Sequence, residues 1–141
     1  MRILGVELTG NDAVICLLQL DRQQFIMPDC RVRKFTLPKN HTREDLQSFQ
    51  FAFAKLAIDY GIEQVAIKER MPKGKFSGSA VSFKLESAIQ LIAELEVVVL
   101  SPTQIKFALA QNALPIPFSS TGLKAFQEAA FLVAYSAHML E

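Results

Sequence analysis

The feature that most constrains this chain is a pair of aliphatic runs at its start, joined by four turn-forming residues. Residues 2–8 and 13–20 are rich in Ile, Leu and Val, and residues 9–12, Thr-Gly-Asn-Asp, favour a tight turn. This pattern predicts a β-hairpin. Residues 31–37 follow a connection that contains Pro28, and they are predicted to form a third strand that ends before Pro38. The sheet is therefore expected to begin as a three-stranded antiparallel meander.

After this meander the hydrophobic period changes to that of a helix. Thr42 and Asp45 have the spacing of a capping box, and apolar residues then recur at helical spacing until Gly61. Further strands are predicted at residues 64–69 and 97–100, of which the second is a continuous aliphatic run typical of a strand covered on both faces. The remaining helices are predicted around residues 85–92, from Pro102 to about Asn112 after a cap at Ser101, and from about 123 to 140.

The order of these elements predicts an α/β fold with one mixed sheet. Right-handed crossovers place the fourth and fifth strands parallel to the first. The expected sheet therefore has five strands, a three-stranded antiparallel meander plus two parallel strands, with helices on both faces. The length of 141 residues fits a single domain, residues 1–141. This element order is that of the ribonuclease H-like fold.

The composition excludes several classes of protein. Half of the residues are hydrophobic and 21% are charged, which is unlike a disordered chain. The formal net charge is +1, so no field of the whole molecule attracts nucleic acid or a membrane. Two cysteines form neither a disulfide framework nor a metal-ligand spacing, and no apolar run is long enough to span a membrane. We therefore expect a cytoplasmic protein with no membrane contact.

Three short segments resemble the Holliday-junction resolvase (RuvC) branch of the ribonuclease H-like superfamily. Residues 3–10, ILGVELTG, resemble its first strand and turn, in which an acidic residue ends the pattern hydrophobic-Gly-hydrophobic-acid. Residues 65–69, VAIKE, look like the fourth strand, which carries a second acid in that branch. Residues 125–130, AFQEAA, are similar to its last helix. The whole chain also resembles a small bacterial family of uncharacterised function with this fold.

The resemblance implies an acidic site for divalent metal ions. Glu7, Glu69 and Glu128 would be the catalytic residues and the ligands of Mg²⁺ or Mn²⁺, and the reaction would be hydrolysis of phosphodiester bonds in structured DNA or RNA. The chain departs from that pattern at two positions, because Glu7 stands where these enzymes usually have Asp and Ala125 stands at the penultimate acidic position. The alternative is a catalytically inactive ribonuclease H-like module for binding or dimerisation.

Each of the three acids also has an ordinary structural explanation. Glu7 lies in an aliphatic strand, where an ionised carboxylate is costly unless it is paired, bound to a metal or open to solvent. Glu69 stands between two basic residues and is equally compatible with the polar end of a strand. Glu128 follows Lys124 by four residues, a spacing that allows an ion pair on a helix.

The loop at residues 71–79 is the best candidate for contacts to nucleic acid. Lys73 and Lys75 supply ammonium groups for phosphate, and Phe76 supplies a ring on which an unstacked base can lie. The alternative is an ordinary loop before a capped helix, since the loop contains no Walker motif.

Surplus apolar residues on two predicted helices suggest self-association. Phe51 lies about 200° around the helix from Phe49, which is on the face expected to contact the core. Leu132 and Met139 similarly lie away from the main apolar face of the last helix. Because one sheet cannot bury both sides of a helix, we expect a homodimer.

The two histidines do not form a metal site. Neither His41 nor His138 has a second His or Cys at the spacing that zinc sites use. His138 falls in the last turn of the final predicted helix, where a positive charge interacts favourably with the helix dipole. We therefore expect a charged imidazole at that position.

Overall fold

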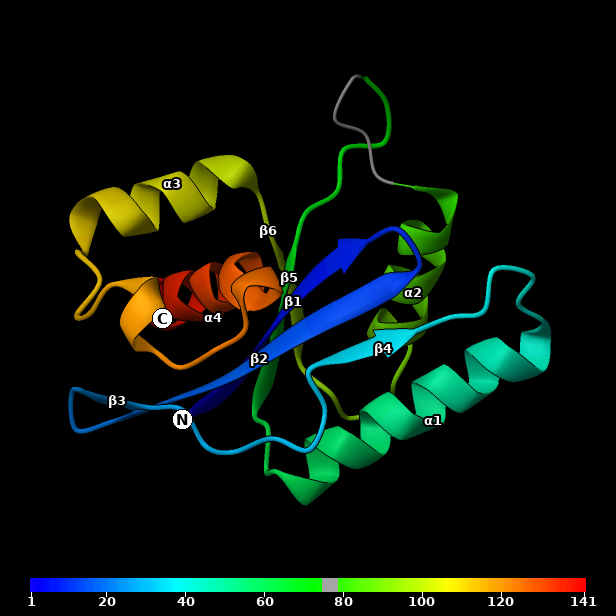
Figure 1. Cartoon of the computed structure of the whole chain (residues 1–141), viewed down its shortest axis with the longest axis horizontal. Helices are drawn as coiled ribbons and strands as arrows, with labels where there is room; N and C mark the ends of the chain where they lie inside the picture. The colour runs from blue at the N-terminus through cyan, green and yellow to red at the C-terminus, as the bar shows by residue number, and fades with distance from the viewer. Residues whose placement is uncertain (75–78) are drawn as a thin grey trace.

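The computed structural model describes residues 1–74 and 79–141, and in this part of the chain six strands form one mixed sheet (Figure 1). The central strand is β1 (Arg2–Thr9), with β2 (Asp12–Asp21) antiparallel on one side and β5 (Gln64–Lys68) parallel on the other. Next to β5 lies β6 (Val97–Leu100), also parallel. Two short strands, β3 (Gln24–Ile26) and β4 (Lys34–Thr36), pair with the outer edge of β2. The ribonuclease H-like architecture is confirmed.

The third strand of the meander differs from the prediction. The sequence predicts one strand over residues 31–37, but only Lys34–Thr36 form it, and β3 is an additional strand. The chain folds back into β3 through Arg22 and Gln23, which both have a positive φ, as the tightest hairpin turns require. Pro28 follows soon after β3 and has no N–H to donate to a sheet, so the two short strands remain separate.

Helices cover both faces of the sheet (Figure 1). On one face lie α1 (Arg43–Asp59) and α2 (Ala80–Gln90), packed on β1 residues Leu4, Val6 and Leu8. On the other lies α4 (Glu128–Leu140), packed on Ile3, with α3 (Pro102–Gln111) against its side. Among the helices described, none combines the length and the apolar character that crossing a membrane requires.

The predicted helix caps are confirmed. At the start of α1 the backbone N–H of Asp45 donates to Thr42 Oγ1 at 3.3 Å, and the Thr42 N–H donates to Asp45 Oδ2 at 2.9 Å. Ser101 and Gln104 form the same reciprocal pair before α3, at 3.1 and 2.8 Å. Each cap stabilises its helix by about 1 kcal/mol. Local sequence therefore determines where these two helices begin.

The last helix begins later than predicted. The periodicity places its start at about residue 123, but Ala125–Gln127 form a 3₁₀ turn and α4 starts only after it. The Gln127 side chain explains this boundary, because its Nε2 donates to Ile15 O at 2.9 Å while its Oε1 accepts from the Lys124 N–H at 3.0 Å. The buried amide of Gln127 thus holds the turn against β2.

Gly5 allows α4 to lie directly on the backbone of β1. A Cβ atom at Gly5 would be 2.0 Å from Ala130 O and 2.8 Å from Ala134 Cβ. Further along the helix, His138 Nε2 lies 2.9 Å from the carbonyl oxygen of Leu18, which pairs with Ile3. The helix therefore runs from the carboxyl end of β1 toward its amino end, with its own N-terminus on the side of Glu7.

His138 is not the charged group expected at the end of a helix. Its side chain is buried, with 6% exposed, and its ring meets that of Phe25 on β3 edge-on at 5.7 Å between centroids. Burial lowers the pKa of the imidazole, with the bond to Leu18 O opposing this shift. The prediction was wrong because the β2–β3 hairpin, which local pattern did not reveal, covers this turn of α4.

Candidate functional site

Glu7 lies near the carboxyl end of β1, on the face of the sheet that α4 covers. Its side chain is 20% exposed. Parallel pairing of Val6 with Ile67 brings Lys68 beside it, with Lys68 Nζ 4.0 Å from Glu7 Oε2. At this distance and exposure an ion pair contributes at most about 1 kcal/mol. The acid in the aliphatic strand therefore has a cation next to it, which is one of the arrangements that the sequence left open.

Glu69 follows β5 directly and is exposed. Its backbone N–H donates to Leu100 O at 2.9 Å, which fixes the chain at the end of the strand. Burial, and after it the negative charge of Glu69, raises the pKa of the Glu86 carboxyl on α2. Glu86 is thus a fourth acid near this edge. Sequence reasoning missed Glu86 because only the packing of α2 brings it near Glu69.

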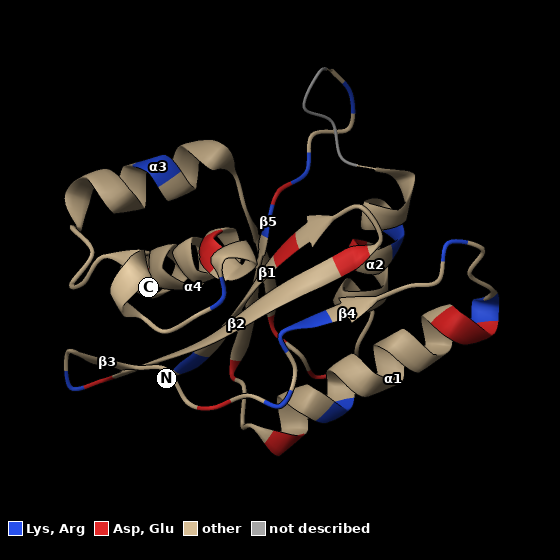
Figure 2. Cartoon of the chain, in the orientation of Figure 1, with Lys and Arg blue, Asp and Glu red and all other residues tan. Residues whose placement is uncertain are grey.

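Glu128 is the first residue of α4 and is exposed. Since α4 begins on the side of Glu7, the three predicted acids lie on elements that converge at one end of the sheet. Figure 2 shows acidic residues near the end of β1, after β5 and at the start of α4. Within the described ranges, however, no group of three or more His, Cys, Asp or Glu is placed to hold a metal ion. A metal-ligand set is therefore not preassembled there.

Basic residues line the end of β5 and the chain that follows it. We call Lys68, Arg70 and Lys73 the β5 rim, which appears as blue segments in Figure 2. Lys73 is exposed, and Arg70 is half-buried, with an Nε atom that has no hydrogen-bond partner within the described part of the chain. Of the other residues predicted to contact nucleic acid, Lys75 and Phe76 lie outside the described residues.

A further cation lies on the opposite side of Glu7. Val14 on β2 pairs with both Glu7 and Lys34, so Lys34 is two strands away from Glu7. Lys34 Nζ lies 5.4 Å from the centre of the Phe126 ring and 3.9 Å from an Asp12 carboxylate oxygen. No sequence signal marked Lys34, because only the pairing of β4 with β2 brings it to this position. Glu7 therefore has a lysine toward each edge of the sheet.

Comparison with known proteins agrees with this fold. A family model described as "Protein of unknown function (DUF3010)" matches residues 1–137. The RuvC structure of Thermus thermophilus has a TM-score of 0.76 at 11% identity, and the match covers 99% of this chain and 94% of that one. T. thermophilus RuvC in complex with a Holliday junction substrate has a TM-score of 0.75 at 13% identity, with the same coverage. No curated protein matches the chain.

Proposed function

This chain belongs to the DUF3010 family, and we propose that it binds structured nucleic acid at the end of the sheet where β1 and β5 terminate. The observation that carries the proposal is the β5 rim, Lys68, Arg70 and Lys73, together with Lys34 on the other side of Glu7. Lysine and arginine on phosphate oxygens supply most of the affinity of nucleic-acid-binding proteins. The RuvC-like fold is compatible with such a ligand, although a fold by itself does not determine function.

The binding proposal is tested by anisotropy of a labelled four-way DNA junction over a range of salt concentrations. Lys73→Gln should weaken binding and reduce the slope of log K against log salt by about 0.9 for each phosphate that the protein no longer neutralises. Lys106→Gln is the matched control, because Lys106 is an exposed lysine on α3 and is not part of the rim. Equal weakening in the two variants, or no binding by the wild type, would refute the placement of the ligand.

We further propose that Glu7, Glu69 and Glu128 bind Mg²⁺ or Mn²⁺, so that the chain hydrolyses phosphodiester bonds in the nucleic acid it binds. Support comes from the convergence of the three acids at one end of the sheet and from the exposure of Glu69 and Glu128, which leaves their carboxylates free to turn. Binding would require Glu7 to exchange its contact with Lys68 for the ion.

The metal proposal is tested by thermal unfolding with and without Mn²⁺. At about 100 times its Kd, a bound ion stabilises the folded chain by about 2.7 kcal/mol. The melting temperature should therefore rise in the wild type and in Glu44→Gln, an exposed acid in the first turn of α1, but not in Glu7→Gln. No rise in the wild type would remove the metal site.

The second candidate function is a catalytically inactive binding module. It is favoured by the absence of a preassembled metal-ligand set among the described residues and by the Lys68 contact of Glu7. This candidate predicts that the junction is bound without cleavage and that Mn²⁺ leaves the melting temperature unchanged. Cleavage that depends on Mn²⁺ and is abolished in Glu7→Gln would exclude it.

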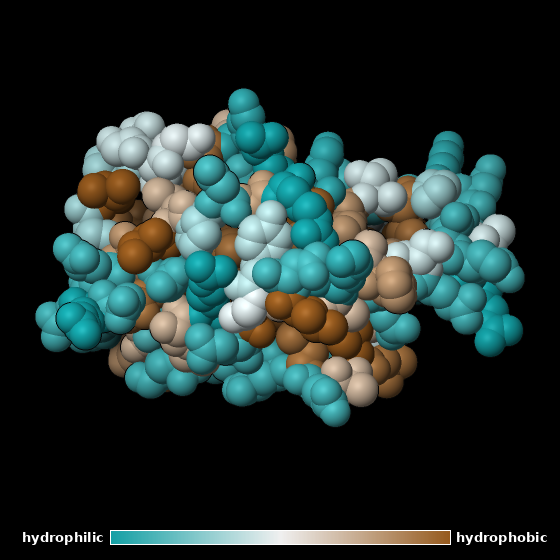
Figure 3. Space-filling view, turned by 90° about the horizontal axis from the view of Figure 1, so that it is seen from below, coloured by the Kyte–Doolittle hydropathy of each residue, from teal (hydrophilic) through white to brown (hydrophobic). Residues whose placement is uncertain are grey.

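We also propose that the chain forms a homodimer through the outer faces of α1 and α2. Phe51 and Ile58 on α1 are 72% and 80% exposed, and Leu91 at the end of α2 is 76% exposed. Leu91 and Ile58 each line a groove beside these helices, and Figure 3 shows hydrophobic side chains gathered on this underside of the molecule. By contrast, Leu132 and Met139 pack partly against the core.

Light scattering tests the dimer. The expected mass is twice the 15.7 kDa of one chain, and Phe51→Ser should shift it toward the monomer. Phe107→Ser on α3, where the side chain is 59% exposed, is the control and should leave the mass unchanged. A monomer mass for the wild type at micromolar concentration would rule the dimer out.

A further inference from the structure

The outer edge of β2 is interrupted between its two short partners. β3 pairs with β2 as far as Gln19 opposite Ile26, and β4 begins to pair only at Val14 opposite Lys34. Continuing the β3 register would place Pro28 opposite Leu17, whereas continuing the β4 register would place Arg31 there. Three excess residues therefore separate the two registers, and the connecting chain bulges away from β2.

Because of this bulge, no strand of the described chain pairs with the backbone N–H and C=O of Leu17 on β2. The Ile15 N–H donates to Arg33 O at 2.9 Å, and Ile15 O accepts from Gln127, so both groups of Ile15 point away from β1. In an antiparallel strand the groups of alternate residues point to the same side, so those of Leu17 also point outward. Within the described part of the chain, no hydrogen bond fills this position of the ladder. Pro28, which would stand opposite, has no N–H to donate.

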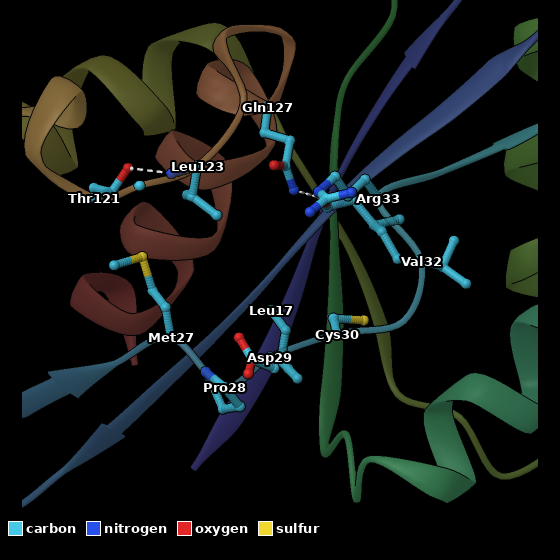
Figure 4. A pocket seen from close by; sticks show the side chains of 12 residues that line it. Leu17, Met27, Pro28, Asp29, Cys30, Val32, Arg33, Thr121, Leu123 and Gln127 are labelled. Atoms are coloured by element: carbon cyan, nitrogen blue, oxygen red, sulfur yellow. Dashed lines mark hydrogen bonds between the residues drawn. The ribbon is translucent and has the colours of Figure 1, made fainter.

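Leu17 lines a cavity of about 170 Å³ (Figure 4), which lies on the side of β2 to which these outward groups point. The cavity lies between β2, the bulge and the chain that precedes α4. Met27 and Leu123 provide apolar wall, and Asp29 and Arg33 also line it. Buried N–H and C=O groups are nearly always hydrogen-bonded, either to water or to another group, so an occupant that replaces water next to Leu17 must offer an acceptor and a donor side by side. A strand would normally supply this pair from one residue.

Size and charge define the class of occupant. An apolar cavity of about 150 Å³ accepts benzene, so about 170 Å³ accommodates one six-membered ring with small substituents. Asp29 and Arg33 are exposed and carry opposite charges, so neither an anion nor a cation is favoured. A ring amide such as a pyrimidine base is neutral, has this size and places an N–H next to a C=O.

We propose that this cavity binds a neutral six-membered heterocyclic amide of the size of a pyrimidine base, held by the N–H and C=O of Leu17. The ligand has two sources, a free base or a base of a nucleic-acid strand. A base of a nucleic-acid strand is a candidate source because the cavity lies near the end of the sheet where β1 and β5 terminate: Gln127 lines the cavity and directly precedes Glu128. Binding of the free base does not depend on the proposed function.

The test uses the ¹⁵N-labelled full chain and the amide signal of Leu17. Uracil should shift this signal, and at a concentration about ten times its Kd it should slow hydrogen exchange of the Leu17 amide about tenfold. The control ligand 1,3-dimethyluracil has the same ring without an N–H and should leave the signal in place. An oligouridylate that produces the uracil shift identifies a strand as a source, and a response to uracil alone identifies the free base.

A matched pair of variants tests the role of the ladder. Pro28→Ala restores an N–H opposite Leu17, which should let β3 extend, protect the Leu17 amide without ligand and abolish the response to uracil. Pro38→Ala lies beyond β4 and should respond as the wild type does. The proposal is overturned if uracil has no effect up to its solubility limit, if dimethyluracil shifts Leu17 equally, or if Pro28→Ala binds uracil like the wild type.

Discussion

Replacing Gly5 with alanine tests the contact that positions α4 on the sheet. The added Cβ would lie 2.0 Å from Ala130 O, whereas ordinary contact begins at 3.4 Å, so α4 must move away by at least 1.4 Å. The opposing atoms include backbone of α4, at Ala130 O and Ala134 N, which no change of side-chain rotamer can remove. Overpacking of this kind costs up to about 3 kcal/mol.

This cost should be visible in thermal and urea unfolding followed by circular dichroism. At about 2.1 cal/mol/K per residue, a chain of 141 residues has an unfolding entropy of about 0.3 kcal/mol/K, so the melting temperature should fall by about 10 °C. Gly10→Ala is the control, because Gly10 has a φ of 58° but open space around its Cβ. There the strain alone costs about 1 kcal/mol, or about 3 °C.

The comparison of the two glycines decides between steric contact and backbone freedom. If Gly5→Ala is no more destabilising than Gly10→Ala, α4 does not lie directly on the backbone of β1. Adding Ala134→Gly to Gly5→Ala should restore only a small part of the stability, because Ala130 O remains in the way. Full recovery in the double variant would show that the Ala134 methyl group, and not the helix backbone, is the obstacle.

Three other predictions concern buried polar groups. Burial lowers the pKa of His138 in the folded chain, so a proton binds more strongly to this side chain in the unfolded chain. The free energy of unfolding should therefore decrease as the pH falls below about 6.5, the ordinary pKa of histidine. In urea titrations, His138→Gln should remove this part of the pH dependence. Gln127→Ala should cost about 1–3 kcal/mol by leaving Ile15 O without its donor, which urea unfolding against wild type would measure. Burial raises the pKa of Cys16 to about 12, so a chromogenic disulfide reagent at pH 8 should titrate only Cys30 in the folded chain and both thiols in denaturant.

Several features of the fold could be predicted from short stretches of sequence. The β1–β2 hairpin follows from two aliphatic runs around a turn. The starts of α1 and α3 follow from Thr42 and Ser101, whose side chains accept from the backbone N–H three residues further along the chain. The parallel strands at 64–68 and 97–100 follow from apolar runs and from the handedness of crossovers. These signals are local, so no knowledge of the packed structure was needed.

The candidate site was only partly accessible in this way. The sequence identified Glu7, Glu69 and Glu128 as acids, but not that Glu7 would lie beside Lys68 or that Lys34 would stand two strands away. The ion-pair partner of Glu7 is set by the register between β1 and β5, and register depends on the pairing of strands far apart in sequence.

The last helix shows most clearly what only the tertiary structure decided. Apolar periodicity predicts a helix that starts at about residue 123. In the structure, the side-chain amide of Gln127 donates to Ile15 O, 112 residues earlier in the chain, and α4 starts only at Glu128. The same packing buries His138, which the sequence placed at a favourable charged position. Apart from β3, local sequence determined the type and order of the strands and α-helices, because backbone propensities and caps act within a few residues. Their exact ends, the state of buried polar groups and the cavity beside Leu17 depend on contacts that exist only after the elements pack.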